Sequence, residues 1–104
     1  MFFPYSIEID IRGKFLSWST VTRAYLGYTE EEMGSLTLFD ILNAKDLEQI
    51  IRAMAKWKTM PKGTSFNIAI RKRHGLWVDV IVAPEAVLDK DFGLMGFKCY
   101  FKEK

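Results

Sequence analysis

The segment from Gly13 to Ser35, GKFLSWSTVTRAYLGYTEEEMGS, decides how the whole chain is interpreted. It runs from a strand-like stretch straight into a predicted helix over residues 21–26. The side chain of Ser19 or Thr20 caps that helix in this interpretation, because a hydroxyl oxygen there accepts a hydrogen bond from a free amide of the first turn. Gly27 ends it, because glycine adopts the left-handed backbone of a helix C-terminus at little cost.

A second short helix follows at once. Thr29 supplies its cap, and Glu32 three residues later completes a capping box. Glu30, Glu31 and Glu32 place negative charge at the amide end of this helix, where the helix dipole favours it, and Gly34 is expected to end it. The junction is therefore built for shape rather than for catalytic side chains.

The rest of the chain predicts five strands and one longer helix. The apolar spacing of DLEQIIRAMAKWK indicates an amphipathic helix over residues 46–58, after a short helical or turn-like segment over 36–42. Alternating or apolar runs predict strands over 5–11, 15–19, 66–73, 76–88 and 94–102, with Pro84 marking a bulge or an unpaired edge. This order predicts an α+β domain, a five-stranded antiparallel sheet with short helices and one longer helix on one face.

Composition limits the classes of function. A chain of 104 residues is one domain's worth, and residues 1–104 are taken as a single domain. A net charge of +2 is too slight to indicate nucleic acid as a partner, and no apolar run is long enough for membrane insertion. The single cysteine, Cys99, excludes an internal disulfide and favours a reducing, cytoplasmic location.

In their order and spacing, these segments resemble a PAS domain. The sequence GYTEEEMG at 27–34 is similar to the family's motif after the first two strands, one residue tighter before the final glycine. NAKDLEQI, RKRHGLWVDV and LMGFKCYF resemble its helix entry, its hairpin and its last strand. Ser19 and His74 stand where many members have Asn and Asp, and Tyr100–Lys102 replaces the usual Asp-Ile-Thr. The resemblance implies a PAS-like fold and a sensory module excised from a larger signalling protein, such as a histidine kinase, cyclase or transcription regulator.

The cofactor chemistry of the family is not matched. Flavin photochemistry in the LOV branch needs a cysteine just before the long helix, and residues 40–44 contain none. Haem-binding members use a histidine on the long helix, whereas the one histidine here, His74, belongs to a polar turn. No nucleophile elbow, Cys-His pairing or metal-ligand cluster is present. We therefore expect no enzyme activity and no cofactor, and a haem- or flavin-bearing sensor is disfavoured.

A small-molecule site under the helices is the remaining chemical prediction. The helical stripe and strand alternation place its lining at Tyr28, Met33, Phe39, Leu42, Ile51, Met54, Ile68, Ile70, Val78 and Val80. The resemblance adds Lys98, which aligns with a glutamine that LOV members keep against flavin. Two alternatives stay open: the core is filled by its own side chains, without a ligand, and Lys98 extends to water.

The same alignment has a consequence for the other face of the sheet. If Lys98 faces the helices, then its neighbours on the last strand face outward. The outer face would then carry the apolar side chains of Trp77, Ile81, Met95, Phe97 and Phe101. Such a face predicts an interface with a second subunit or with a flanking helix of the parent protein. The alternative functions are thus a ligand sensor that dimerises and an interaction-only module.

Overall fold

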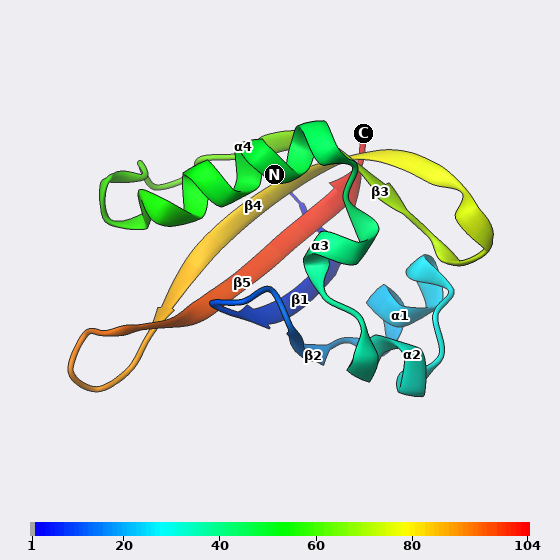
Figure 1. Cartoon of the computed structure of the whole chain (residues 1–104), viewed down its shortest axis with the longest axis horizontal. Helices are drawn as coiled ribbons and strands as arrows, with labels where there is room; N and C mark the ends of the chain where they lie inside the picture. The colour runs from blue at the N-terminus through cyan, green and yellow to red at the C-terminus, as the bar shows by residue number, and fades with distance from the viewer. Residues whose placement is uncertain (1) are drawn as a thin grey trace.

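The computed structural model describes residues 2–104 and shows one antiparallel sheet with helices on one side (Figure 1). The sheet has the strand order β2-β1-β5-β4-β3. Its strands are β1 (Tyr5–Asp10), β2 (Phe15–Trp18), β3 (Phe66–Arg71), β4 (Trp77–Leu88) and β5 (Leu94–Glu103). The last strand of the chain therefore lies in the middle, between β1 and β4. The predicted five-stranded antiparallel α+β fold is confirmed.

Four α-helices connect β2 to β3, namely α1 (Thr20–Leu26), α2 (Glu30–Ser35), α3 (Leu38–Ile41) and α4 (Ala44–Ala55). Two 3-10 turns complete the fold, η1 (Trp57–Thr59) after α4 and η2 (Arg73–Gly75) between β3 and β4. Within the described residues, no helix combines the length and apolar character needed to cross a bilayer.

The caps predicted from the sequence are present. The Ser19 side chain accepts from the Thr22 amide, and Gly27 ends α1 with a φ of 85°. Thr29 and Glu32 form the reciprocal capping box of α2. The predicted end of α2 at Gly34 is wrong by one residue, because α2 continues through Ser35.

The long helix starts earlier than predicted. Asn43 is its N-cap and accepts a hydrogen bond from the Asp46 amide at 2.8 Å, so α4 begins at Ala44 rather than at Asp46. It also ends earlier, at Ala55, because the last predicted turn becomes the 3-10 turn η1. The Asn43 cap thus sets the start of α4 two residues before the predicted start at Asp46.

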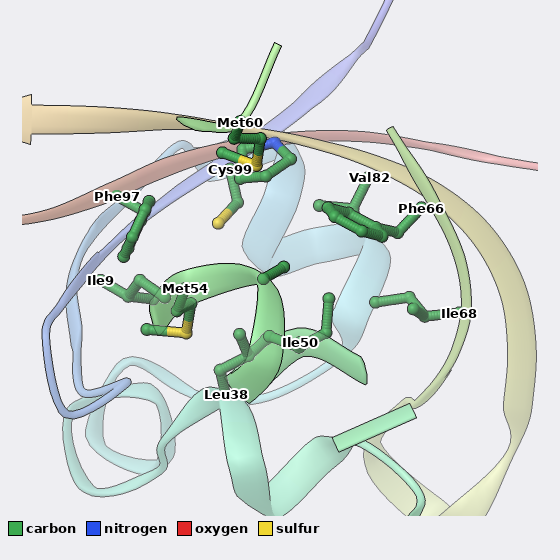
Figure 2. A pocket seen from close by; sticks show the side chains of 12 residues that line it. Ile9, Leu38, Ile50, Met54, Met60, Phe66, Ile68, Val82, Phe97 and Cys99 are labelled. Atoms are coloured by element: carbon green, nitrogen blue, oxygen red, sulfur yellow. The ribbon is translucent and has the colours of Figure 1, made fainter. Parts of the chain in front are cut away.

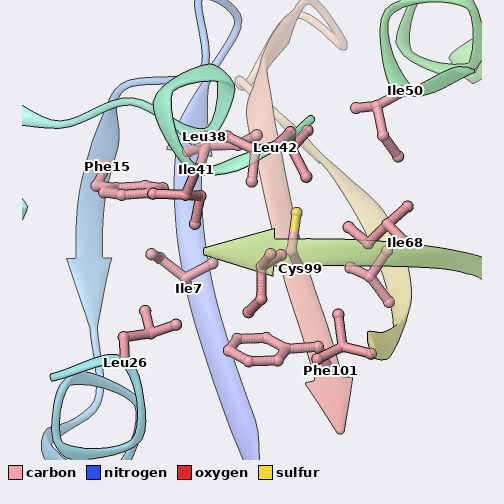
Figure 3. Packing of buried hydrophobic residues seen from close by; sticks show 14 of the residues in the cluster. Ile7, Phe15, Leu26, Leu38, Ile41, Leu42, Ile50, Ile68, Cys99 and Phe101 are labelled. Carbon is pink, nitrogen blue, oxygen red and sulfur yellow. The ribbon is translucent and has the colours of Figure 1, made fainter. Parts of the chain in front are cut away.

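The core lies between the inner face of the sheet and the helices (Figure 3). On β5, the side chains of Phe97, Cys99 and Phe101 point inward and are 1%, 5% and 5% exposed. They pair across the sheet with Ile9, Ile7 and Tyr5 of β1. The central strand β5 therefore contributes three buried side chains to the sheet side of the core.

The predicted orientation of β5 is wrong. Phe97 and Phe101 face the helices, and Lys98 is exposed on the outer face, in register with Glu8 of β1 and Glu85 of β4. The physical reason is that an ammonium group loses its hydration in an apolar core. With Lys98 outward, the opposite charges of two neighbouring strands flank it.

Pro84 occupies a position that tolerates its missing N–H. β3 pairs with β4 only as far as Val82, so β4 from Ala83 onward pairs with β5 alone. Pro84 lies opposite Cys99 in that second half and removes no bond to β3. The prediction of an unpaired edge at Pro84 is confirmed, whereas the register irregularity of this ladder falls later, between Val87 and Leu88.

Candidate functional site

An apolar cavity of about 30 Å³ lies between α4 and the inner face of the sheet (Figure 2). Strands β1, β3, β4 and β5 contribute side chains to it, together with α3, α4 and the segment after η1. Its lining consists of Ile9, Leu38, Ile50, Ala53, Met54, Met60, Phe66, Ile68, Val82, Pro84, Phe97 and Cys99. The cavity is therefore a product of tertiary packing, with no single segment that dominates it.

Local periodicity explains how each element aims its side chains at this space. Ile50, Ala53 and Met54 stand at the i, i+3 and i+4 positions of α4, which share one face of a helix. On the strands, the lining residues are two apart, as for Phe97 and Cys99 on β5, because every second side chain points to the same face.

The cavity offers a ligand almost no polar contact. Its one heteroatom group besides the two thioethers is the Cys99 thiol, whose sulfur points toward the interior in Figure 2. Burial raises the pKa of Cys99 to about 12, so the thiol stays protonated near neutral pH. Charged ligands would lose hydration there without gaining a partner. The arrangement suits at most a very small, uncharged, apolar guest, since a space of about 30 Å³ is only a few times what one water molecule needs.

A second apolar cavity of about 30 Å³ lies beside the first. It shares Leu38, Ile68, Val82 and Cys99 with the first cavity and extends along the sheet toward Ile70, Val80 and Phe101. The inner face of the sheet is therefore incompletely filled at two adjoining places.

The structure brings only some of the predicted ligand-binding residues together. Met54 and Ile68 line the first cavity, and Ile70 and Val80 line the second. Of the others, Met33, Leu42 and Val78 pack in or against the core without lining either cavity. Phe39 and Ile51 lie at a more open groove, described below. Lys98 is on the other face of the sheet, so its predicted place in the site is wrong.

Tyr28 is held in place by the backbone rather than directed at a ligand. Its hydroxyl donates to the Arg71 carbonyl oxygen at 2.6 Å. Burial raises the pKa of Tyr28 above its ordinary value, so the hydroxyl keeps the proton that it donates. Tyr28 thereby ties the end of α1 to β3, and its prediction as a polar ligand contact is not supported by the geometry.

Several residues that line the cavity were not predicted to do so, although the apolar pattern of the sequence pointed to most of them. Phe97 and Cys99 alternate with Lys98, a pattern that places the apolar side chains inward. Ile50 belongs to the apolar stripe of α4. Met60 had no such signal, because it lies after η1 in a segment without periodicity.

The outer face of the sheet is more mixed than predicted. Trp77 and Ile81 alternate with the buried side chains of β4 and are directed away from the core, and Trp77 is 46% exposed. Met95 is 55% exposed beside the register shift between Val87 and Leu88, near the opposite end of β4 from Trp77. With Phe97 and Phe101 turned inward, these side chains are separated by charged residues such as Lys98. The predicted interface set is thus reduced to two of its five members, Trp77 and Ile81.

Among residues 2–104, no group of three or more His, Cys, Asp or Glu side chains is arranged to hold a metal ion. The lining of the main cavity includes no histidine and no arginine. The residues that line it therefore provide no imidazole ligand for haem and no guanidinium group for a flavin phosphate.

Comparisons with known proteins place the fold. The sequence matches no protein-family model, and a comparison with curated proteins finds no match either. Solved structures do match. A PAS domain from Desulfitobacterium hafniense is 18% identical, with a TM-score of 0.76 over 96% of this chain and 92% of the other. A PAS domain from a two-component sensor histidine kinase is 19% identical, with a TM-score of 0.77 over 96% and 84%. The PAS-B domain of Cycle from Drosophila melanogaster, solved with bound glycerol, is 10% identical, with a TM-score of 0.82 over 96% and 99%.

Proposed function

Because the chain has the PAS fold, we propose that it is a sensory and signal-transduction module that binds a small uncharged ligand in the cavity under α4. The observation that carries the proposal is the cavity itself, a partly open apolar space of about 30 Å³ between the long helix and the central strands. Natural cores are usually filled to the density of an organic crystal, so unfilled space in the centre of a small domain requires an explanation.

The signal would leave through the sheet. A ligand that binds one arrangement of α4 more tightly than another shifts the population toward that arrangement. Phe97 and Cys99 transmit the change, because they line the cavity on the inner side of β5, the strand that also presents Lys98 outward. A flanking helix of the parent protein or a second copy of the chain would dock on the outer face around Trp77 and Ile81, two outward side chains of β4.

The module acts without catalysis in this proposal. A nucleophilic cysteine needs a lowered pKa, and burial raises that of Cys99. His74, the one histidine of the sequence, lies in the exposed turn η2 on a different element. The buried, reduced thiol also agrees with a cytoplasmic location.

Xenon binding followed by NMR tests the site. The probe is xenon gas, and the reporter is the ¹³C-labelled methyl group of Met60, which lines the cavity. We expect saturable shifts of Met60, and their loss in Ala53→Leu, which fills the space from α4. Gln49→Leu is the matched control, because Gln49 is exposed on the same helix and lines neither the two cavities nor the groove beside them. If the chemical shift of the Met60 methyl group does not change with xenon, the cavity is not a binding site, and the interaction-only module remains as the function.

Native mass spectrometry separates the two functions in the protein as purified. Excess mass that disappears on denaturation identifies a bound small molecule. A doubled mass without a ligand favours the interaction-only alternative, in which Trp77→Ala returns the chain to a monomer.

A further inference from the structure

A groove of about 250 Å³ opens beside the main cavity. It lies where the C-terminal half of α4 faces the β1–β2 turn and the start of β5, at the left of Figure 1. The residues that line it all have apolar side chains: Ile11, Phe39, Ile51, Met54, Ala55, Leu94 and Phe97. The groove is more open to solvent than the cavity and leaves Ile11 56% and Ile51 50% exposed.

Two side chains belong to both spaces. Met54 of α4 and Phe97 of β5 line the cavity on one side and the groove on the other. Phe97 is 1% exposed and packed into the core, whereas Met54 is only partly buried. Methionine has an unbranched side chain with three rotatable bonds, so Met54 is the member of this pair that can move without disturbing the sheet.

We propose that the groove is the mouth of the cavity, that Met54 is the movable partition between them, and that the site takes an unbranched alkyl chain. This inference rests on the proposed function and names the ligand class for it. A narrow chain passes where Met54 moves aside, and the apolar lining continues from Leu94 in the groove to Met60 in the cavity, both of which are half-buried. A polar end group would stay in water at the open end, because the cavity offers it no strong hydrogen-bond partner.

A homologous series of alcohols measures how far a chain enters. The probes are 1-butanol, 1-hexanol and 1-octanol, and the reporters are the methionine methyl groups. Each methylene that leaves water increases affinity roughly fourfold. We expect this gain to persist up to 1-octanol, with shifts of both Met54 and Met60. Met33, fully buried and outside both spaces, serves as the internal reference.

A variant that blocks the groove tests whether the groove is the entrance to the cavity. Ala55 is exposed, lines the groove and does not line the cavity, so Ala55→Trp fills the mouth alone. We expect at least tenfold weaker binding of 1-octanol with unchanged xenon shifts at Met60. Gln49→Trp adds the same ring elsewhere on α4 and should leave 1-octanol binding unchanged.

The outcomes separate this inference from the proposed function. Affinity that does not grow with chain length, or 1-octanol shifts at Met54 without Met60, overturns the inference. If Met60 still responds to xenon in that case, the cavity remains a binding site. If Met60 responds to neither xenon nor any alcohol, both the proposed function and the inference fail.

Discussion

Gly96 is the position at which a single methyl group tests the central pairing of the sheet. It lies on β5 opposite Asp10 of β1. A Cβ atom added at Gly96 would overlap the carbonyl oxygen of Ile9 and approach the Asp10 Cα to 3.0 Å. Both obstacles are backbone atoms of the neighbouring strand, so no side-chain rotation relieves the contact. Gly96→Ala must separate β1 from β5 locally.

The size of the effect follows from this geometry. Extra methyl groups in packed interiors destabilise by about 1–3 kcal/mol, and the rigid obstacle places Gly96→Ala near about 3 kcal/mol. Unfolding entropy scales with chain length, and for about 100 residues each kcal/mol lowers Tm by roughly 4–5 °C. We therefore expect Gly96→Ala to melt roughly 10–15 °C below the parent protein in thermal denaturation followed by circular dichroism.

Gly34→Ala is the matched control. Gly34 lies inside α2, and nothing comes within 4 Å of an added Cβ. Alanine is the better helix former by about 1 kcal/mol, so this variant should melt a few degrees higher. A loss below about 4 °C for Gly96→Ala would show that β1 and β5 do not approach as closely as described.

Three further changes test other parts of the structure. Phe97→Ala should reduce the free energy of unfolding, measured in urea, by about 3–5 kcal/mol. Trp77→Ala should reduce it by no more than about 0.5 kcal/mol. Equal losses would contradict the inward orientation of Phe97 and the outward orientation of Trp77. Thr22 is fully buried, and its hydroxyl accepts a hydrogen bond from the Ser6 amide at 2.9 Å. Thr22→Val should therefore reduce the free energy of unfolding by about 1–3 kcal/mol, and an unchanged free energy would argue against that hydrogen bond. Burial raises the pKa of Cys99 to about 12, so the buried thiol stabilises the folded state below the ordinary thiol pKa, and this stabilisation is lost as pH rises toward 12. The Tm of the parent protein should therefore fall more steeply above about pH 9 than the Tm of Cys99→Ala. Parallel pH profiles of the two Tm values would refute the burial of Cys99.

Much of the fold was accessible from local patterns. The turn glycines and the cap at Thr29 act within a few residues, so the two small helices could be located from the sequence. The amphipathic stripe of α4 was equally visible, although its start was not, because the Asn43 cap precedes the stripe. Strand positions followed from alternation, and their ends agree closely with the observed bounds.

The candidate site was less accessible, and β5 shows why. Its residues from Phe97 to Lys102 alternate apolar with polar or charged, and that alternation places Lys98 outward. The resemblance to PAS domains suggested the opposite face, and a shift of one residue exchanges the two faces of a strand. The alternation was the better guide, since it reflects the free energy needed to bury an ammonium group.

The sequence by itself determined which segments are helices and strands, because caps, turns and periodicity act over a few neighbouring residues. Only the tertiary structure decided where space remains. The cavity depends on how α4, Met60 and four strands approach one another, and the groove on how the β1–β2 turn meets α4. Unfilled volume is the difference between large packed volumes contributed from distant parts of the chain, so no local pattern encodes it.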